Sequence, residues 1–245
     1  MIFKNLKPTV IVTGGSSGIG FNLSNFFLDK GINVVNVDRK KIKIFKKNYK
    51  FINCDLLKVN LIKKKLSILK NEKKIIGLIN CAGITISKES IKYKIRDWNK
   101  TLSVNLTAPF YISQIISKIM LKNKTKGSII NIASISGKIA MPNNPAYNAS
   151  KAGLLNLTKS LAVDLAKYKI RVNSISPGYT ITSLNKKSWN NKSLRSIRTK
   201  KTSLKRWASP NEYNEAVLFL LDNKKSSYMT GANITIDGGW TSKGL

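Results

Sequence analysis

The sequence contains no histidine. The side chain that most often carries protons near neutral pH is therefore missing, and a zinc site with histidine ligands is excluded. Any general acid or base has to come from tyrosine, lysine, aspartate, glutamate or cysteine.

Cysteines and long apolar stretches are also scarce. The two cysteines, Cys54 and Cys81, each follow a short apolar run, which indicates small buried residues rather than a disulfide or a metal site. This use of cysteine is typical of a reducing compartment, so we expect a cytoplasmic location. Runs of about 18 consecutive apolar residues do not occur, and no segment is expected to cross a membrane.

Acidic residues are few, with 11 Asp and Glu against 44 Lys and Arg, which gives a net charge of +33. A strongly basic chain is compatible with nucleic acid, an anionic surface or acidic substrates as partners. Lysine, asparagine and isoleucine are abundant together throughout, as in proteins from A/T-rich genomes, so a compositional origin is favoured. Signatures of RNA-recognition, zinc-finger or basic-region proteins are absent. A nucleic-acid-binding protein on an oxidoreductase fold remains the less favoured alternative.

The 245 residues contain no linker or internal repeat, which predicts one domain over residues 1–245. Apolar runs bounded by turn residues alternate with helix-period segments, which predicts an α/β fold: a doubly wound parallel sheet of about seven strands flanked by helices. The expected strands are Thr9–Val12, Ile32–Val37, Lys50–Ile52, Ile75–Ile79, Ser128–Ile132, Arg171–Ile175 and Asn233–Ile236. A late helix is expected to begin with a capping box formed by Ser209, Pro210 and Glu212.

Tyr147 and Lys151 lie in the stretch YNASK, where a separation of four residues places both side chains on one face of a helix. A tyrosine hydroxyl has a pKa of about 10, and a nearby positive charge favours the phenolate and lowers that pKa. The pair is therefore a candidate acid/base device, although both residue types are also common on helix surfaces.

A glycine-rich loop, TGGSSGIG, follows the first expected strand. The start of the next helix offers free N–H groups and a dipole that can hold a pyrophosphate, and glycines let the backbone approach phosphates closely. The spacing of Gly14, Gly18 and Gly20 is a variant of the dinucleotide fingerprint. The candidate cofactor-binding residues of this loop are Gly14, Ser16, Ser17, Gly18, Ile19 and Gly20.

Asp38 ends the second expected strand, 20 residues after Gly18. An acid at this separation reaches the adenosine ribose hydroxyls and repels a 2′-phosphate, which favours NAD. The neighbouring Arg39, Lys40 and Lys41 favour NADP, so NADP remains possible.

Seven features occur in order: TGGSSGIG, Asp55 after the third strand, NCAG at residues 80–83, Asn105, Ser134, YNASK, and PG at Pro177 and Gly178. In this combination the chain resembles the short-chain dehydrogenase/reductase family over nearly its whole length. Cys81 departs from the pattern, since the family usually has a second asparagine there. The resemblance implies a Rossmann-like fold and an NAD(P)-dependent oxidoreductase that acts on a secondary alcohol or ketone. It also implies a homotetramer, with the helices carrying Asn105 and Tyr147 packed between subunits.

Residue roles follow from the same resemblance. Tyr147 would be the general acid/base, and Ser134 would hydrogen-bond the substrate oxygen. Lys151 would hold the nicotinamide ribose and lower the pKa of Tyr147, while Asn105 would support a water in the proton relay. The site would work without a metal. Further implied cofactor contacts are Asp55 and Leu56 against the adenine, Asn80, Ala82 and Gly83 beside the cofactor, Thr182 near the carboxamide, and the loop of Pro177 and Gly178.

Residues 181–206 are expected to form a mobile lid that sets the substrate. The cations of this lid and Trp189 suggest a substrate that is anionic or bound to a carrier protein. The length of the chain and its compact active-site region resemble 3-oxoacyl-carrier-protein reductases, whereas the ending DGGWTSKG resembles sugar or polyol dehydrogenases and members that act in surface-sugar biosynthesis. Both alternatives stay open.

Overall fold

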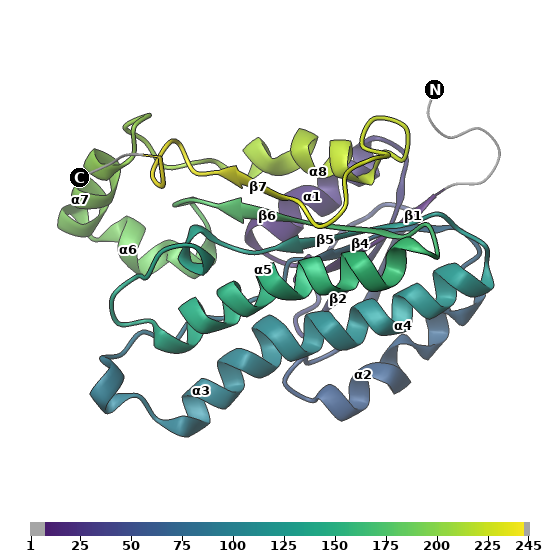
Figure 1. Ribbon diagram of the computed structural model, residues 1–245, viewed down its shortest axis with the longest axis horizontal. Helices are drawn as coiled ribbons and strands as arrows, with labels where there is room; N and C mark the ends of the chain where they lie inside the picture. The colour runs from purple at the N-terminus through teal and green to yellow at the C-terminus, as the bar shows by residue number, and fades with distance from the viewer. Residues whose placement is uncertain (1–7, 243–245) are drawn as a thin grey trace.

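The computed structural model describes residues 8–242, which form one seven-stranded sheet with helices on both faces (Figure 1). The strands are β1 (Thr9–Thr13), β2 (Asn33–Asp38), β3 (Tyr49–Asn53), β4 (Ile75–Asn80), β5 (Ser128–Ile132), β6 (Arg171–Pro177) and β7 (Asn233–Ile236). The helices are α1 (Gly18–Asp29), α2 (Val59–Leu66), α3 (Ile95–Leu102), α4 (Ala108–Lys122), α5 (Pro145–Ala166), α6 (Lys186–Asn190), α7 (Lys192–Lys201) and α8 (Asn214–Leu221). The predicted α/β class and single doubly wound domain are confirmed.

All strands are parallel and lie in the order β3-β2-β1-β4-β5-β6-β7. The order reverses between β1 and β4, because the chain first builds outwards from β1 and then returns to its other side. Open sheets of this kind bind ligands beyond the carboxyl ends of the strands at such a switch point. The loops after β1 and β4 therefore meet where a ligand is expected.

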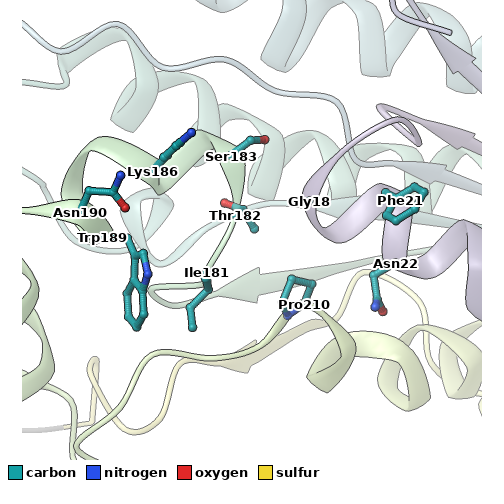
Figure 2. Close-up of a pocket in the computed structure, with 10 residues that line it drawn as sticks. All are labelled: Gly18, Phe21, Asn22, Ile181, Thr182, Ser183, Lys186, Trp189, Asn190 and Pro210. Carbon is teal, nitrogen blue, oxygen red and sulfur yellow. The ribbon is translucent and has the colours of Figure 1, made fainter. Parts of the chain in front are cut away.

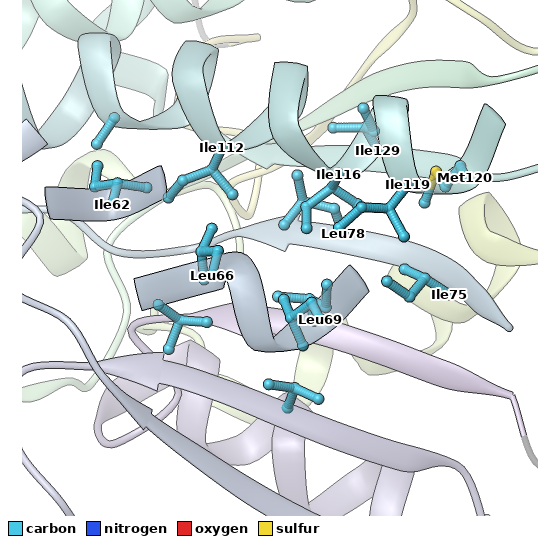
Figure 3. Packing of buried hydrophobic residues seen from close by; sticks show 14 of the residues in the cluster. Ile62, Leu66, Leu69, Ile75, Leu78, Ile112, Ile116, Ile119, Met120 and Ile129 are labelled. Atoms are coloured by element: carbon cyan, nitrogen blue, oxygen red, sulfur yellow. The ribbon is translucent and has the colours of Figure 1, made fainter. Parts of the chain in front are cut away.

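Two apolar clusters cover the two faces of the sheet. Successive residues of a strand point to opposite faces, so Ile11 lies in one cluster while Val10 and Val12 lie in the other. The first cluster packs the sheet against α2, α4 and α5, and Figure 3 shows Ile112 and Ile116 of α4 in it. The second packs the sheet against α1 and α8. The central strands are buried on both faces and are therefore largely apolar, as in β1, although β2, β4, β5 and β6 each also bury an asparagine.

The seven strands agree with the predicted ranges to within two residues at each end. The capping box is also present: the carboxylate of Glu212 accepts a hydrogen bond from the Ser209 N–H at 2.7 Å. This turn is a 3-10 helix, Pro210–Tyr213, and α8 begins only at Asn214. Within residues 8–242, none of the helices combines the length and apolar composition needed to cross a bilayer.

Candidate active site

The glycine-rich loop between β1 and α1 adopts a shape that only glycine permits at two positions. Gly14 has a φ of +70°, and a Cβ on it would lie 2.8 Å from the Cα of Ala82. A Cβ on Gly20 would lie 2.4 Å from the carbonyl oxygen of Gly14. The start of α1 carries no acidic residue, and its N-cap Ser17 makes no side-chain cap. The loop therefore presents uncapped main-chain N–H groups suited to an anion such as a pyrophosphate.

Asp38 lies directly beside this loop at the end of β2. Its carboxylate accepts hydrogen bonds from the Ser16 N–H at 3.1 Å and from the Lys40 N–H at 3.0 Å. The side-chain amide of the fully buried Asn36, in β2, donates a hydrogen bond of 3.0 Å to the Ser16 hydroxyl. The structure thus brings the predicted ribose-reading acid and the predicted phosphate loop into contact.

The loop after β4 is held against the glycine loop by Thr13. The Thr13 hydroxyl accepts hydrogen bonds from the N–H groups of Cys81 and Ala82, at 3.1 and 3.2 Å. Asn80 is buried and donates to Ser113 of α4 and to Asn131 of β5, at 3.1 and 2.9 Å. Asn80, which the sequence predicts to lie beside a cofactor, is the last residue of β4. Its side chain is held within the fold at the base of the loop. Sequence reasoning missed the positioning role of Thr13, although Thr13 opens the glycine motif.

Asp55 and Leu56 follow β3. The carboxylate of Asp55 accepts the N–H of Leu57 at 3.1 Å, which fixes a turn. The Leu56 side chain is buried in the core cluster between the sheet and α2, so a contact with an adenine would have to come from its main chain.

Asn105 lies in a π-helical turn, Ser103–Thr107, which separates α3 from α4. Its side chain is fully buried and pairs with Ile84 twice, accepting from the N–H and donating to the carbonyl, both at 2.9 Å. It also donates to the hydroxyl of Ser150 in α5 at 3.1 Å. Asn105 therefore ties the loop after β4 to α5, and π-turns of this kind are frequent at functional sites.

Ser134, Tyr147 and Lys151 come together where β5 ends and α5 begins. The hydroxyl of Ser134 is hydrogen-bonded to the Tyr147 phenol. The Lys151 ammonium lies 5.7 Å from the centre of the Tyr147 ring and donates to the carbonyl of Ile132 at 2.7 Å. Gly83 lies beside this group, since a Cβ on it would be 3.8 Å from Lys151 Nζ.

Burial dominates the titration of this cluster. It raises the pKa of Tyr147 above its ordinary value, which the hydrogen bond from Ser134 only partly offsets. It also lowers the pKa of Lys151 from 10.5 to about 8. The pKa of Tyr147 is therefore raised in this structure, because desolvation outweighs the hydrogen bond from Ser134.

Cys81 lies next to the same cluster. As a residue it is partly exposed, whereas Cys54 is buried as predicted. Desolvation raises the pKa of the Cys81 thiol to about 12, opposed by Lys151 and a main-chain hydrogen bond from Gly20. Within residues 8–242, clusters of three or more potential Cys, Asp or Glu metal ligands are absent.

The loop after β6 closes the site from the other side. A Cβ on Gly178 would lie 2.7 Å from the Cα of Asp237, and one on Gly18 would lie 3.3 Å from the side chain of Thr182. Pro177 is the last residue of β6. Thr182 therefore packs directly on the glycine loop.

A cavity of about 430 Å³ opens between α1, the loop after β6 and α6 (Figure 2). It is lined by Gly18, Phe21, Asn22, Ile181, Thr182, Ser183, Lys186, Trp189, Asn190 and Pro210. Ser134, Tyr147 and Lys151 do not line it. The cavity thus adjoins the phosphate-binding end of the predicted cofactor site rather than the reacting groups.

Comparisons with known proteins agree with this geometry. A family model described as enoyl-(acyl carrier protein) reductase matches residues 14–241. The chain is 34% identical to an NAD-dependent glycerol dehydrogenase of Listeria innocua, over 98% of this chain and 96% of that protein. It is 35% identical to a 3-oxoacyl-acyl-carrier-protein reductase of Chlamydia pneumoniae, over 95% and 96%. A solved structure of 4-hydroxyisoleucine dehydrogenase complexed with NADH superimposes with a TM-score of 0.92 at 35% identity, covering 97% of this chain and 100% of that chain.

Proposed function

The chain belongs to the short-chain dehydrogenase/reductase family of oxidoreductases, and on that premise we propose that it interconverts a secondary alcohol and a ketone with Tyr147 as the acid/base. One observation carries the proposal: the buried Ser134 and Lys151 meet the half-buried Tyr147 beside Gly83, at the carboxyl edge of the sheet. A nicotinamide cofactor, when bound, supplies the hydride chemistry.

The residues of this chain fit such a cofactor. A side chain at Gly14 or Gly20 would clash with the main chain of the glycine-rich loop and its neighbours. The uncapped N–H groups at the start of α1 suit a pyrophosphate. We infer a preference for NAD, because the Asp38 carboxylate is fixed against Ser16, where it would repel a 2′-phosphate. The solved 4-hydroxyisoleucine dehydrogenase holds NADH, which supports this preference.

Proton management falls to Tyr147. Ser134 is placed to donate a hydrogen bond to the substrate oxygen while Tyr147 delivers a proton to that oxygen in ketone reduction. In alcohol oxidation the same proton travels back to the phenolate. A raised pKa keeps the phenol protonated near neutral pH, which favours the reductive direction there. The oxidative direction should gain as pH rises.

The test is a titration of protein fluorescence with NADH and NADPH, followed by turnover of polyols, hydroxy acids and simple ketones with both cofactors. A DNA-binding assay over a salt series runs beside it. We expect tighter binding of NADH and oxidoreductase turnover. Binding of neither cofactor, together with steeply salt-dependent DNA binding, would instead favour the nucleic-acid alternative.

A second candidate within the same chemistry is reduction of a 3-oxoacyl group on a carrier protein. It is supported by the 35% identity to the Chlamydia pneumoniae reductase and by a lid that carries many cations and no acid. Comparing kcat/KM for a 3-oxoacyl thioester with that for a polyol separates the two. A higher value for the thioester, strengthened when the acyl group is carried on a carrier protein, would favour the reductase.

We also propose the homotetramer expected from the family, in the cytoplasm. Phe110 of α4 is 43% exposed and Val163 of α5 is 78% exposed, so both helices carry large apolar side chains on the surface. Covering them would offset the repulsion between subunits of charge +33. Light scattering at low and moderate salt tests this, and a monomer at both would contradict it.

A further inference from the structure

Two arginines of the lid differ from its other cations. The lid cations are Lys186, Lys187, Lys192, Arg195, Arg198, Lys200, Lys201, Lys205 and Arg206. All of these are exposed except Arg195 and Arg198, which are half-buried. They are three residues apart on α7 and therefore share one face of that helix.

Both guanidinium groups rest on aromatic rings. The Arg198 guanidinium lies 4.7 Å from the centre of the Tyr179 ring, and that of Arg195 lies 5.0 Å from the centre of the Trp189 ring. The two rings are linked through Trp207, at centroid distances of 5.0 and 5.3 Å. Such contacts hold a guanidinium in place while leaving its N–H donors free for another partner.

Neither of these guanidinium groups has an ion pair within residues 8–242. Arg206, at the end of the same segment, shows the opposite arrangement: it pairs with both oxygens of Glu212, at 2.8 and 2.6 Å. Residues 165–211 contain no Asp or Glu, so the sequence near Arg195 and Arg198 offers no carboxylate for an ion pair. A partly desolvated guanidinium without a carboxylate is a site suited to an external anion.

Tyr179 connects this face of the lid to the reacting groups. It directly follows Pro177 and Gly178, and its hydroxyl contacts the sulfur of Met141 at 3.7 Å. The Met141 carbonyl in turn accepts a hydrogen bond of 2.8 Å from Asn148, the neighbour of Tyr147. The Tyr179 ring therefore contacts Arg198 of the lid and, through its hydroxyl, Met141 in the loop that precedes Tyr147.

From this arrangement we propose that Arg198 is the specificity-determining residue of the lid, where it binds an oxyanion group of the substrate, a carboxylate or a phosphate remote from the reacting carbon. Arg195 adds to the positive field beside it. The inference rests on the proposed function and narrows it, because it assigns the enzyme to hydroxy or oxo acids and their phosphorylated counterparts rather than to neutral polyols.

The first experiment compares matched substrates on wild type, Arg198→Met and Arg198→Lys. One pair is a hydroxy acid and its amide, and the other is a polyol and its phosphate monoester. We expect kcat/KM for the preferred anion to fall about ten- to hundred-fold in Arg198→Met, mainly through KM, with little change for the neutral partner. Arg198→Lys should recover part of the loss, since it keeps the charge without the planar fork. Which pair responds distinguishes carboxylate from phosphate.

Lys200→Met is the matched control, because it removes an exposed charge from the same helix. Tryptophan fluorescence of Trp189, Trp207 and Trp240 verifies that the lid keeps its packing in each variant. Equal losses for anionic and neutral substrates in Arg198→Met, or no preference of wild type for anions, would overturn the inference.

A binding measurement makes the inference independent of turnover. Malonate and inorganic phosphate are titrated by calorimetry into wild type and Arg198→Met, each saturated with NADH. Weaker binding of at least one anion to the variant supports the proposed site, and equal binding contradicts it. Failure of the proposed function would appear differently, as absence of NADH binding in wild type.

Discussion

Lys151 Nζ lies 5.7 Å from the centre of the Tyr147 ring and is held there by the main-chain carbonyl of Ile132 rather than by a carboxylate. The Lys151 side chain is only 4% exposed. Burying an ammonium against one neutral carbonyl costs free energy, which appears as the lowered pKa of about 8. The proposed catalytic group is thus assembled at the expense of stability, as is common for functional sites.

Replacing Lys151 by Met should therefore stabilise the protein while removing its activity. A pKa lowered from 10.5 to about 8 corresponds to roughly 3 kcal/mol. The variant also loses the hydrogen bond from Lys151 to the Ile132 carbonyl, which lowers its stability by about 1 kcal/mol and offsets part of the gain. We expect the free energy of unfolding at pH 7 to rise by ~2 kcal/mol, measured by urea denaturation.

The pH dependence of the free energy of unfolding tests whether the buried charge of Lys151 destabilises the native state. Between about pH 8 and 10.5 the unfolded chain holds a proton on Lys151 that the native state has lost, so this residue makes wild type more stable as pH rises. Below about pH 8 the full penalty is present. Lys151→Met lacks this contribution, and the difference between the two proteins should shrink across the window. A variant less stable than wild type at every pH would contradict the assignment.

Tyr147→Phe should bind NADH as wild type does and lose nearly all turnover. The substitution removes the hydroxyl that Ser134 contacts and leaves the ring in place over Lys151. Since general acid/base catalysis contributes about a hundred- to ten-thousand-fold, kcat should fall by at least that much. Wild-type alcohol oxidation should increase with pH because the pKa of Tyr147 is raised, and this slope should vanish in the variant. Retained turnover in Tyr147→Phe would remove Tyr147 from the mechanism.

The sheet could be predicted from sequence because both of its faces are buried. A strand such as β1 (Thr9–Thr13) is buried along its whole length and is apolar between its two threonines, and turn residues follow it. The helical turn around Asn105 could not be predicted, since a π-turn depends on the tertiary contact between Asn105 and Ile84.

The sequence predicts which candidate residues lie near one another, but it does not predict the direction of their pKa shifts. The residues that meet at the carboxyl edge, such as Asp38 and Ser16, come from motifs that directly follow strands. The direction of the Tyr147 pKa shift depends on how much solvent the fold removes from the phenol, and spacing along the sequence carries no information about that. For the same reason the stacking of Arg198 on Tyr179 emerges only from the packing of the lid.

Asp38→Ala should narrow the preference for NAD over NADP. The carboxylate accepts hydrogen bonds from the N–H groups of Ser16 and Lys40, and within residues 8–242 it forms no ion pair with a side chain. Loss of a charge-assisted hydrogen bond to a ribose hydroxyl should lower kcat/KM for NAD about ten- to hundred-fold, with a smaller change for NADP. Asp29→Asn changes the net charge equally on the protein surface and serves as the control. An unchanged cofactor ratio in Asp38→Ala would mean that Asp38 does not read the ribose.

Asn105→Ala should lower the free energy of unfolding and also increase the mobility of the loop after β4. The substitution removes the partner of the N–H and carbonyl of the partly buried Ile84 and of the hydroxyl of the fully buried Ser150. Leaving such groups unpaired costs roughly 2–4 kcal/mol, which thermal unfolding would detect. Asn25→Ala, which loses one hydrogen bond on the surface of α1, should change stability far less. Because Ile84 follows Gly83, the freed loop should also raise KM, and hydrogen exchange should increase at Ile84 first. Protection of Ile84 equal to that in wild type would mean that the loop is held in place by packing alone.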